Sequence, residues 1–482
     1  MTFRPVFRLL GLNGLLLTLA FGLCAGVGRW GFSESLRPWI PAIGLALLLG
    51  ILGFFSSPRG RKKRPFMRKE ILLTVGIGWL LNGLLGAVPY GTIGGKSFCD
   101  ALFESCSGLT STGASVIGNL AEMPKGLLLW RSLSQWLGGL GFVAFFVPFF
   151  GTHTPLSKFL YANESTAILT EDCAPVDLRR HMWKSLSVYI LLTLLGGSLF
   201  YGIGMNLLEA VCYGMTTLGT GGFCLPRGET PGLSSPLVEW AMIPMMFLGG
   251  VNFLLLFRAL TFRTSEMLFN TEFIVYFILA VGSGIGLALP LMHQGYPLLE
   301  SLRGGLFQAT SLLTTTGYPG IDPQVWPEGF TPLFMTLMFV GGCSGSTAGG
   351  IKVFRIILLF KIVFLHLEKI FRRSVVRPLQ LGGQRWTEED QYNLLCYFLL
   401  IVLSSLVVLC GLGIIFPEMG FKSLFSLHMA CFFNTGLGNF SGGFESLPPA
   451  VKLVESFVMV AGRLELYALL VFFSPSFWKS FD

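Results

Sequence analysis

Residues 312–320 read LLTTTGYPG, and three similar stretches occur elsewhere in the chain. They are GLTSTGAS at 108–115, TTLGTGGF at 216–223 and FFNTGLGN at 432–439. Each stretch places a threonine directly before a glycine, and each follows an apolar segment. One such pair is uninformative because threonine and glycine are common in loops. Four pairs at comparable places instead indicate that one structural unit is repeated four times.

The composition predicts a membrane protein. Of 482 residues, 52% are hydrophobic and 12% are charged, whereas about 25% are charged in an ordinary soluble domain. The apolar run at 9–27 follows Arg4 and Arg8, as in a secretory signal, but a second apolar run at 40–55 comes directly after it. We therefore expect an uncleaved first transmembrane helix and a chain that crosses the membrane many times.

The basic residues give the chain a net charge of +8. They gather in short connections between apolar runs, most densely in PRGRKKRPFMRK at 58–69. This distribution predicts that these connections and the N-terminus face the cytoplasm, and it does not indicate nucleic-acid binding. A polybasic patch that contacts membrane lipid is the alternative interpretation of this run. The cysteines and histidines show no metal-ligand spacing, although Cys99 and Cys106 are close enough in sequence to pair.

Long apolar runs continue to the end of the chain, and each is long enough for a membrane helix of about 20 residues. They lie at about 71–90, 126–150, 185–205, 235–260, 270–292, 332–365, 393–416 and 451–478. Taken in order, these eight runs form four pairs. Between the two members of each pair lies a shorter stretch whose length suits a re-entrant helix. These stretches are 98–109, 207–217, 299–313 and 423–433.

The pairing predicts five parts of the chain. An appended pair of transmembrane helices at 1–66 precedes pore repeats at 67–152, 153–264, 265–375 and 376–482. A pair of small residues follows each Thr–Gly stretch at a similar distance: Gly138–Gly139, Gly249–Gly250, Gly341–Gly342 and Ala461–Gly462. Ordinary small-residue helix packing is the alternative reading of these pairs, but their recurrence favours duplication.

Non-helical backbone inside a bilayer is tolerated only where protein surrounds it or where it lines an aqueous cavity. Four Thr–Gly loops around one axis satisfy this rule, and their carbonyl oxygens would replace the water around a dehydrated cation. Glycine adopts the required dihedral angles without a Cβ penalty, and re-entrant helices would direct negative C-terminal ends toward the ion. The predicted ion-binding residues are Thr110, Ser111, Thr112, Gly113, Leu218, Gly219, Thr220, Gly221, Thr314, Thr315, Thr316, Gly317, Phe433, Asn434, Thr435 and Gly436, with potassium at Thr112, Thr220, Thr316 and Thr435.

The sequence resembles the TrkH-type subunits of the Trk/Ktr/HKT potassium transporters. The resemblance rests on FESCSGLTSTGAS at 103–115, LWRSLSQWLGGLGF at 129–142, FVGGCSGSTAGGIKVFRIILLFK at 339–361 and GRLELYALLVFFSPSFW at 462–478. It implies an all-α polytopic membrane protein with four pseudo-symmetric helix–pore-loop–helix repeats around one pore, plus two N-terminal helices. A glycine at each key position goes with potassium preference in this family. The fourth loop departs from the family pattern at Phe433 and Thr435, which bears on ion preference.

The resemblance also implies potassium uptake across the bacterial inner membrane. Family members act as homodimers with a cytosolic TrkA-type ring that binds NAD or adenine nucleotides, and 153–184 and 361–392 would dock that ring. The transported potassium ion is the implied ligand, and no covalent cofactor is expected. The sequence leaves open whether flux is channel-like or a cation/proton or cation/sodium symport.

The stretch GGCSGSTAGG at 341–350 interrupts an apolar run. Helix propensity falls there because each glycine costs about 1 kcal/mol relative to alanine. A simple kink is the alternative, whereas the resemblance implies an intramembrane gate below the filter. The predicted gate residues are Gly341, Gly342, Ser344, Gly345, Ser346, Thr347, Gly349, Gly350, Lys352 and Arg463.

Five charged residues near or within apolar runs have predicted roles. Lys352 and Arg355 are three residues apart and are expected to share a helix face; anchoring the cytoplasmic end of that helix is the alternative to a gating role. Arg463 lies in VMVAGRLELYALLVFF, where an intramembrane charge suggests function, and by resemblance it meters cations near the gate. Glu104 and Arg131 are expected to pair and brace the first loop.

Two other classes of protein are less consistent with the sequence. A membrane enzyme needs converging nucleophilic, acid–base or metal groups, and the apolar runs contain no such cluster. A secondary transporter with a site between broken helices fits the break at 341–350, but the four units all run in the same sense instead of forming inverted pairs.

Overall fold

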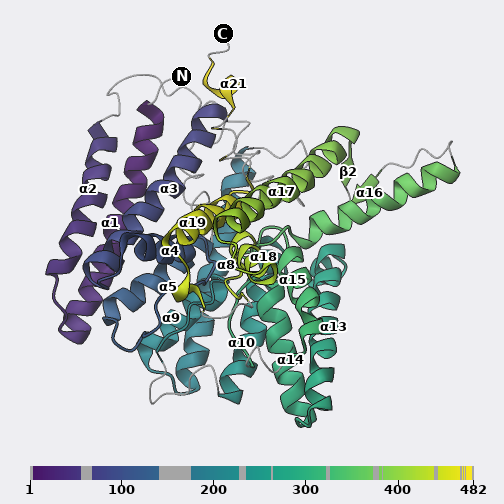
Figure 1. Cartoon of the computed structure of the whole chain (residues 1–482), viewed down its shortest axis with the longest axis horizontal. Helices are drawn as coiled ribbons and strands as arrows, with labels where there is room; N and C mark the ends of the chain where they lie inside the picture. The colour runs from purple at the N-terminus through teal and green to yellow at the C-terminus, as the bar shows by residue number, and fades with distance from the viewer. Residues whose placement is uncertain are drawn as a thin grey trace.

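The computed structural model is built almost entirely of helices (Figure 1). It describes residues 4–55, 68–139, 175–226, 235–261, 264–321, 326–372, 379–382, 384–438, 443–466, 469, 472 and 474–479. Within these residues, six helices are long and apolar enough to cross a membrane, or seven if one bent pair counts as a span. The predicted class, an all-α polytopic membrane protein, is confirmed.

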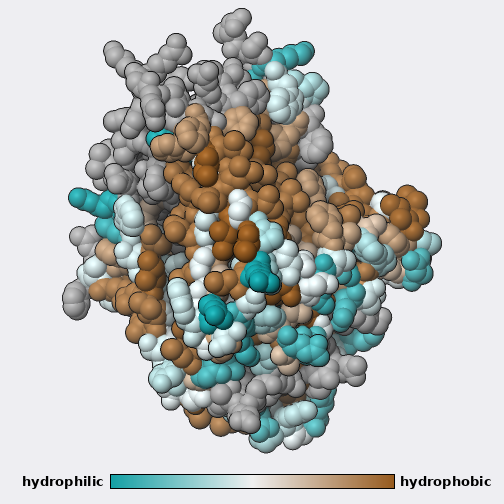
Figure 2. Space-filling view, turned by 90° about the vertical axis from the view of Figure 1, so that its left-hand side faces the viewer, coloured by the Kyte–Doolittle hydropathy of each residue, from teal (hydrophilic) through white to brown (hydrophobic). Residues whose placement is uncertain are grey.

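The first two helices form a hairpin on one side of the molecule (Figure 1). Helices α1 (Arg4–Phe32) and α2 (Ile40–Phe55) approach closely, since a Cβ at Gly11 would lie 2.6 Å from the Gly53 Cα. Large side chains such as Leu48 and Phe55 remain exposed, and Figure 2 shows a broad hydrophobic area on this side. Such a surface suits contact with lipid.

The rest of the chain holds four sets of helices in which a long helix precedes a short one. The first set is α3 (Arg68–Thr92), α4 (Phe98–Leu109) and α5 (Lys125–Gly139), and the second is α8 (Pro175–Gly202), α9 (Leu207–Leu218), α10 (Pro236–Gly249) and α11 (Phe253–Leu260). The third is α12 (Thr264–Leu268), α13 (Thr271–His293), α14 (Leu298–Leu313), α15 (Thr331–Val340) and α16 (Val353–Phe371). The fourth begins with the antiparallel hairpin β1 (Leu379–Leu381) and β2 (Gln384–Trp386), followed by α17 (Glu388–Ile415), α18 (Phe421–Phe432), α19 (Pro449–Arg463) and α21 (Pro475–Trp478).

The four short helices, α4, α9, α14 and α18, coincide with the predicted re-entrant stretches to within two residues at either end. Side chains at the start of two of them explain where they begin: Ser97 accepts a hydrogen bond from the Asp100 backbone N–H, and Asn206 accepts one from Glu209. These caps satisfy backbone donors that have no partner within the helix. The predicted boundaries between whole repeats stay predictions.

Three apolar runs are broken. The break in the run at 332–365 falls at 341–350 as predicted, whereas the runs at 235–260 and 451–478 were expected to be continuous helices. Between α10 and α11 the chain bends by 105°, and Asn252 starts the second piece by accepting hydrogen bonds from the backbone of Leu254 and Leu255. The run at 332–365 is split into α15 and α16, and the run at 451–478 leaves the helix after Arg463. Each break falls at or beside a small-residue pair, where helix propensity is weak. The run at 126–150 passes beyond the described residues after Gly139.

Candidate functional site

The backbone follows the same path after each short helix. The residue beyond the C-cap takes a left-handed conformation, with φ of 55° at Ser111, 47° at Thr220, 55° at Thr315 and 53° at Asn434. Two residues later comes a glycine with positive φ: Gly113, Gly222, Gly317 and Gly436. A left-handed non-glycine residue costs roughly 1–2 kcal/mol, so four such residues at equivalent places indicate a geometry that the surrounding protein imposes.

These four segments pack against one another in a closed cycle. A Cβ at Gly113 would collide with the carbonyl oxygen of Gly221, and one at Gly222 with that of Thr316. In the same way, a Cβ at Gly317 would meet the Thr435 carbonyl, and one at Gly436 would meet the carbonyl of Thr112. The first segment therefore contacts the second, the second the third, the third the fourth, and the fourth the first. Only glycine fits at each of these contacts.

The predicted register of the second segment is wrong by one residue. Gly222, not Gly221, has the positive φ, so Gly221 is the counterpart of Thr112, Thr316 and Thr435. Thr220 corresponds to Ser111, and Leu218 is the last residue of α9. The physical reason is Gln135, whose amide Nε2 donates to the Gly221 carbonyl at 2.6 Å and fills the space that a side chain at Gly221 would need.

The threonine hydroxyls hydrogen-bond in two of the segments. The Thr110 and Thr112 hydroxyls are 2.7 Å apart, as are those of Thr314 and Thr316. In the fourth segment Phe433 replaces the first threonine, and the buried Thr435 hydroxyl has no hydrogen-bond partner among the described residues. The departures from the family pattern at Phe433 and Thr435 therefore leave this hydroxyl without a partner in the described part of the chain.

Asn434 ties the fourth segment to the first. Its Nδ2 donates to the Thr112 hydroxyl at 2.9 Å and to the Met459 carbonyl at 3.0 Å. Asn434 is 2% exposed, so this amide is a buried link within the cycle.

The small-residue pairs bring the following helices close to the ends of the short ones. A Cβ at Gly138 would collide with the carbonyl of Leu109, the last residue of α4, and one at Gly462 would collide with the carbonyl of Phe432 at the end of α18. The recurrence noted in the sequence therefore has a steric cause in at least these two sets. Glycine is required because each helix backbone is held against a carbonyl oxygen.

The loop between α15 and α16 is bonded to the segments of the cycle. The Gly349 N–H donates to the Thr315 hydroxyl at 2.6 Å, and the Thr347 hydroxyl donates to the Leu218 carbonyl at 2.8 Å. A side chain at Gly349 would also strike the Phe433 carbonyl. The predicted gate residues thus lie at the helix-proximal ends of the second, third and fourth segments.

Arg463 connects this loop to the first set of helices. Its guanidinium donates to the Thr347 carbonyl at 3.0 Å and to the carbonyls of Gly138 and Gly139, each at 2.8 Å. The ammonium of Lys352 donates to the Ala348 carbonyl. Both cations therefore bind backbone oxygens of the loop or its surroundings.

The expectation that Lys352 and Arg355 share a helix face is wrong. Lys352 has a φ of 82° and precedes α16, which begins at Val353. Arg355 instead pairs with Glu465 at 2.8 Å and lies over the Tyr397 ring at 4.7 Å. Glu465 reaches it because the chain turns left-handed there, with a φ of 55°, after α19 ends.

Glu104 and Arg131 form the predicted pair, at 2.8 Å, and each side chain is 1% exposed. Glu104 accepts from the Val116 N–H at 2.9 Å, and Arg131 donates to the Ser115 hydroxyl and the Cys224 carbonyl, both at 3.1 Å. The guanidinium also lies 4.1 Å from the centre of the Phe223 ring. The pair therefore forms as predicted, and it contacts the second segment as well as the first.

Sequence reasoning missed three residues that hold the site. They are Gln135, Asn252, whose Nδ2 donates to the Ser344 carbonyl at 2.6 Å, and Glu272, whose carboxylate accepts from the Ser344 N–H at 2.6 Å. The available signal was a polar side chain, an amide or a carboxylate, inside an apolar run. Such a signal does not identify the backbone group with which the side chain forms a hydrogen bond. No group of three or more metal-binding side chains occurs in the described part of the chain, where Cys99 and Cys106 are both free.

Comparison with known proteins supplies the family. Residues 79–480 match the family model described as TrkH, cation transport protein. The chain is 28% identical to the Trk system potassium uptake protein TrkH of Escherichia coli, over 99% of this chain and all of that one. It is 30% identical to TrkG of the same organism, covering 83% and 84% of the two chains.

A solved structure agrees with these sequence matches. The crystal structure of the potassium transporter TrkH from Vibrio parahaemolyticus has a TM-score of 0.85 at 26% identity, covering 99% of this chain and 100% of that one. The resemblance inferred from the motifs is confirmed, and the chain belongs to the TrkH family of cation transport proteins.

Proposed function

We propose that this protein takes up potassium ions across the cytoplasmic membrane of a bacterium, and that the ions pass along the axis enclosed by the four glycine-bearing segments. The observation that carries the proposal is the closed cycle of contacts among them. The names of the relatives, Trk system potassium uptake proteins, support the choice of ion.

Backbone oxygens would provide the selectivity. Removing a cation from water into a low dielectric costs on the order of tens of kcal/mol, and rings of carbonyl dipoles replace the lost hydration. With the register corrected, one ring comprises the carbonyls of Thr112, Gly221, Thr316 and Thr435, all of which face a neighbouring glycine. The C-terminal ends of the four short helices adjoin these segments, and their partial negative charge favours a cation.

The loop at 341–350 would act as the gate. Its bonds to Thr315 and Leu218, together with the hydrogen bond from Arg463 to Thr347, hold it against three of the four segments. Opening would require these bonds to break together or exchange. A stretch rich in glycine suits such a change because its backbone has many accessible conformations.

Regulation would come from partner subunits. We propose a homodimer whose cytosolic face, including the hairpin β1–β2 and residues 361–372, docks a TrkA-type nucleotide-binding ring. This arrangement places the N-terminus in the cytoplasm, as the basic connections suggest. It requires no enzymatic step by this chain.

Flux from liposomes tests the proposal. The purified chain should release rubidium in preference to sodium, and its partner with nucleotide should change the rate. Gly317→Val should abolish release, because its Cβ would strike the Thr435 carbonyl, whereas Gly286→Val is the matched control, since a Cβ there meets nothing within 4 Å. Equal rubidium and sodium rates, or normal flux in Gly317→Val, would refute the filter.

The same liposomes separate a channel from a symport. A symport predicts that an imposed proton or sodium gradient drives rubidium against its own gradient. A channel predicts that it does not.

A further inference from the structure

The residue that directly follows the positive-φ glycine differs in each of the four segments. These residues are Ala114, Phe223, Tyr318 and Leu437, so only the third segment has a hydroxyl at this place. Tyr318 is fully buried, and its backbone carbonyl accepts a hydrogen bond from the Ser311 hydroxyl of α14 at 3.0 Å. A buried phenol usually finds a hydrogen-bond partner, and the partners of Tyr318 lie outside its own set of helices.

The Tyr318 hydroxyl reaches the second set of helices. It lies 2.5 Å from the Thr216 hydroxyl and 3.1 Å from the Thr217 hydroxyl, both in the last turn of α9. Both threonines are buried. A phenol can donate one hydrogen bond and accept another, so these two threonines satisfy it. The third segment is thereby bonded to the helix that precedes the second segment.

The same two threonines hold the backbone of the second segment. The Gly221 N–H donates to the Thr216 carbonyl at 2.8 Å, and the Thr220 N–H donates to the Thr217 carbonyl at 3.2 Å. The carbonyl of Gly221 is one of the four in the proposed ring. Tyr318 is therefore linked, through one residue, to the turn that positions a carbonyl of the neighbouring segment.

A further contact fixes the direction of these hydrogen bonds. The Thr216 hydroxyl donates to the Tyr213 carbonyl at 3.4 Å, so its proton is used there. The Tyr318 hydroxyl then donates to Thr216 and accepts from Thr217. A phenylalanine at 318 would remove both bonds and would leave the buried Thr216 oxygen without its donor.

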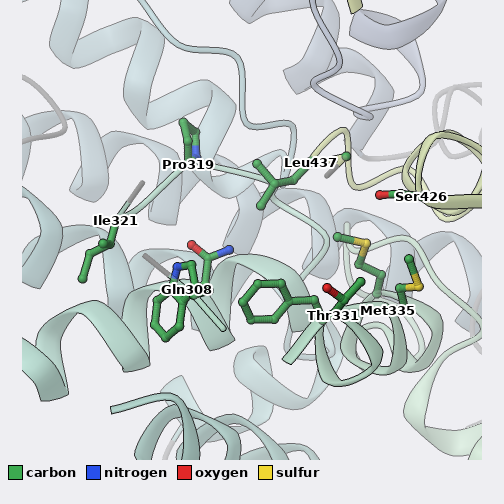
Figure 3. A pocket seen from close by; sticks show the side chains of 11 residues that line it. Gln308, Pro319, Ile321, Thr331, Met335, Ser426 and Leu437 are labelled. Atoms are coloured by element: carbon green, nitrogen blue, oxygen red, sulfur yellow. The ribbon is translucent and has the colours of Figure 1, made fainter. Parts of the chain in front are cut away.

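Apolar side chains adjoin the third segment on the side of the fourth. Figure 3 shows Pro319, the residue after Tyr318, and Leu437, the counterpart of Tyr318 in the fourth segment, at the wall of one small pocket. Neither side chain has a hydrogen-bonding atom. Tyr318 thus makes a polar link to the second segment that Pro319 and Leu437 do not make toward the fourth.

We infer that Tyr318 is a specificity-determining residue, which holds the third segment at a fixed distance from the second through Thr216 and Thr217. A sodium ion is smaller than a potassium ion, so carbonyl oxygens must move closer together to replace its water. The link from Tyr318 to α9 opposes that movement of the third segment and so favours the larger ion. This inference rests on the proposed function, because it concerns the ion that the proposed ring selects.

The selectivity of Tyr318→Phe tests this inference. Release of rubidium and of sodium is measured in parallel from liposomes that contain the full chain, and the ratio of the two rates is compared. The ratio does not depend on how much folded protein each preparation holds. We expect it to fall at least fivefold in Tyr318→Phe, because sodium release rises. Tyr201→Phe, at an exposed tyrosine in the last turn of α8, is the matched control and should keep the wild-type ratio.

The partner hydroxyl gives a second test. Thr216→Val removes the nearer hydroxyl and keeps the shape of the side chain, so the ratio should fall at least threefold. The double variant with both changes should have a ratio no lower than that of Tyr318→Phe, because both changes remove the same bond. If Tyr318→Phe does not fold, Thr216→Val remains as the test.

Ion binding in detergent separates this inference from transport. An ion that binds only the folded protein raises the unfolding temperature. Potassium should therefore raise the unfolding temperature of the wild-type protein more than sodium does at the same concentration. The difference between the two ions should shrink by at least half in Tyr318→Phe and should not change in Tyr201→Phe.

The outcomes distinguish the inference from the proposed function. A wild-type ratio in both Tyr318→Phe and Thr216→Val would overturn the inference and leave the proposed filter in place. A double variant whose ratio falls by the product of the two single effects would also overturn it, since the two hydroxyls would then act separately. Equal release of both ions by the wild-type protein, with equal stabilisation by both, would overturn the proposed function and the inference with it.

Discussion

The guanidinium of Arg463 lies 3.0 Å from the carbonyl oxygen of Thr347 and 2.8 Å from those of Gly138 and Gly139. One side chain thereby joins the end of α19, the loop at 341–350 and the end of α5. A cation in an apolar run is costly unless its donors are satisfied, and here backbone oxygens satisfy them. Arg463 is therefore better explained as a residue that hydrogen-bonds the loop in place than as an isolated charge that faces the ion.

Arg463→Ala should therefore raise leak. Hydrogen bonds to a charged group contribute about 1.5–3 kcal/mol each, so losing the bond to Thr347 should favour the released loop by roughly tenfold or more. Rubidium release from liposomes without the partner measures this change. Arg463→Lys should be intermediate, because an ammonium cannot reproduce the planar fork of the guanidinium. Wild-type leak in Arg463→Ala at equal protein density would contradict the assignment.

Glu272 binds the same loop at a different residue, by accepting a hydrogen bond from the Ser344 N–H at 2.6 Å. Glu272→Ala should increase leak several-fold, since the buried N–H would lose its acceptor at a cost of about 1–3 kcal/mol. Glu272→Gln retains an oxygen and should have a smaller effect. Glu300→Ala, an exposed glutamate in the first turn of α14, is the control. If all three variants leak equally, the hydrogen bond between Glu272 and Ser344 does not keep the loop in place.

The fourth segment should respond to mutation differently from the third. Thr435→Val removes a buried hydroxyl that lacks a partner among the described residues, so thermal stability should stay level or rise. Thr316→Val breaks the 2.7 Å contact with the Thr314 hydroxyl and should cost about 1 kcal/mol. Thermal unfolding of the two purified variants in one detergent makes the comparison. A larger loss in Thr435→Val would show that its hydroxyl has a partner after all.

The sequence predicts the short helices well because their signals are local. Asn206 caps α9, and a positive-φ glycine follows each helix two residues after a left-handed residue. The register of the second segment is not predictable in this way. It depends on Gln135, which lies 86 positions from Gly221 in the chain, and a Thr–Gly pair at 220–221 gives a plausible but wrong alignment.

The glycine-rich stretch at 341–350 predicts one of the three broken helices, but the other two breaks are not visible in the sequence for a similar reason. Gly249–Gly250 reads as a packing pair in a continuous apolar run, yet the chain bends there by 105° because Asn252 caps a new helix. The Cys343 N–H then donates to the Gly250 carbonyl at 2.8 Å. This partner comes from another set of helices, so no local pattern identifies the break.

The buried pair of Glu104 and Arg131 leads to a prediction about its exchange for the residues of the third set. Glu104→Gln alone leaves a buried guanidinium without its carboxylate, and Arg131→Phe alone leaves a buried carboxylate without its cation; each should cost about 3–5 kcal/mol. In the third set, Gln308 lies six residues before the C-cap of its short helix, as Glu104 does, and Phe334 lies seven residues before the small-residue pair, as Arg131 does. The double variant carries this neutral combination and leaves no charge unpaired. It should therefore unfold at a higher temperature than either single variant, with a coupling energy of at least about 2 kcal/mol. Thermal unfolding of the four proteins completes the cycle, and strictly additive losses would mean that Glu104 and Arg131 do not stabilise each other in the folded protein.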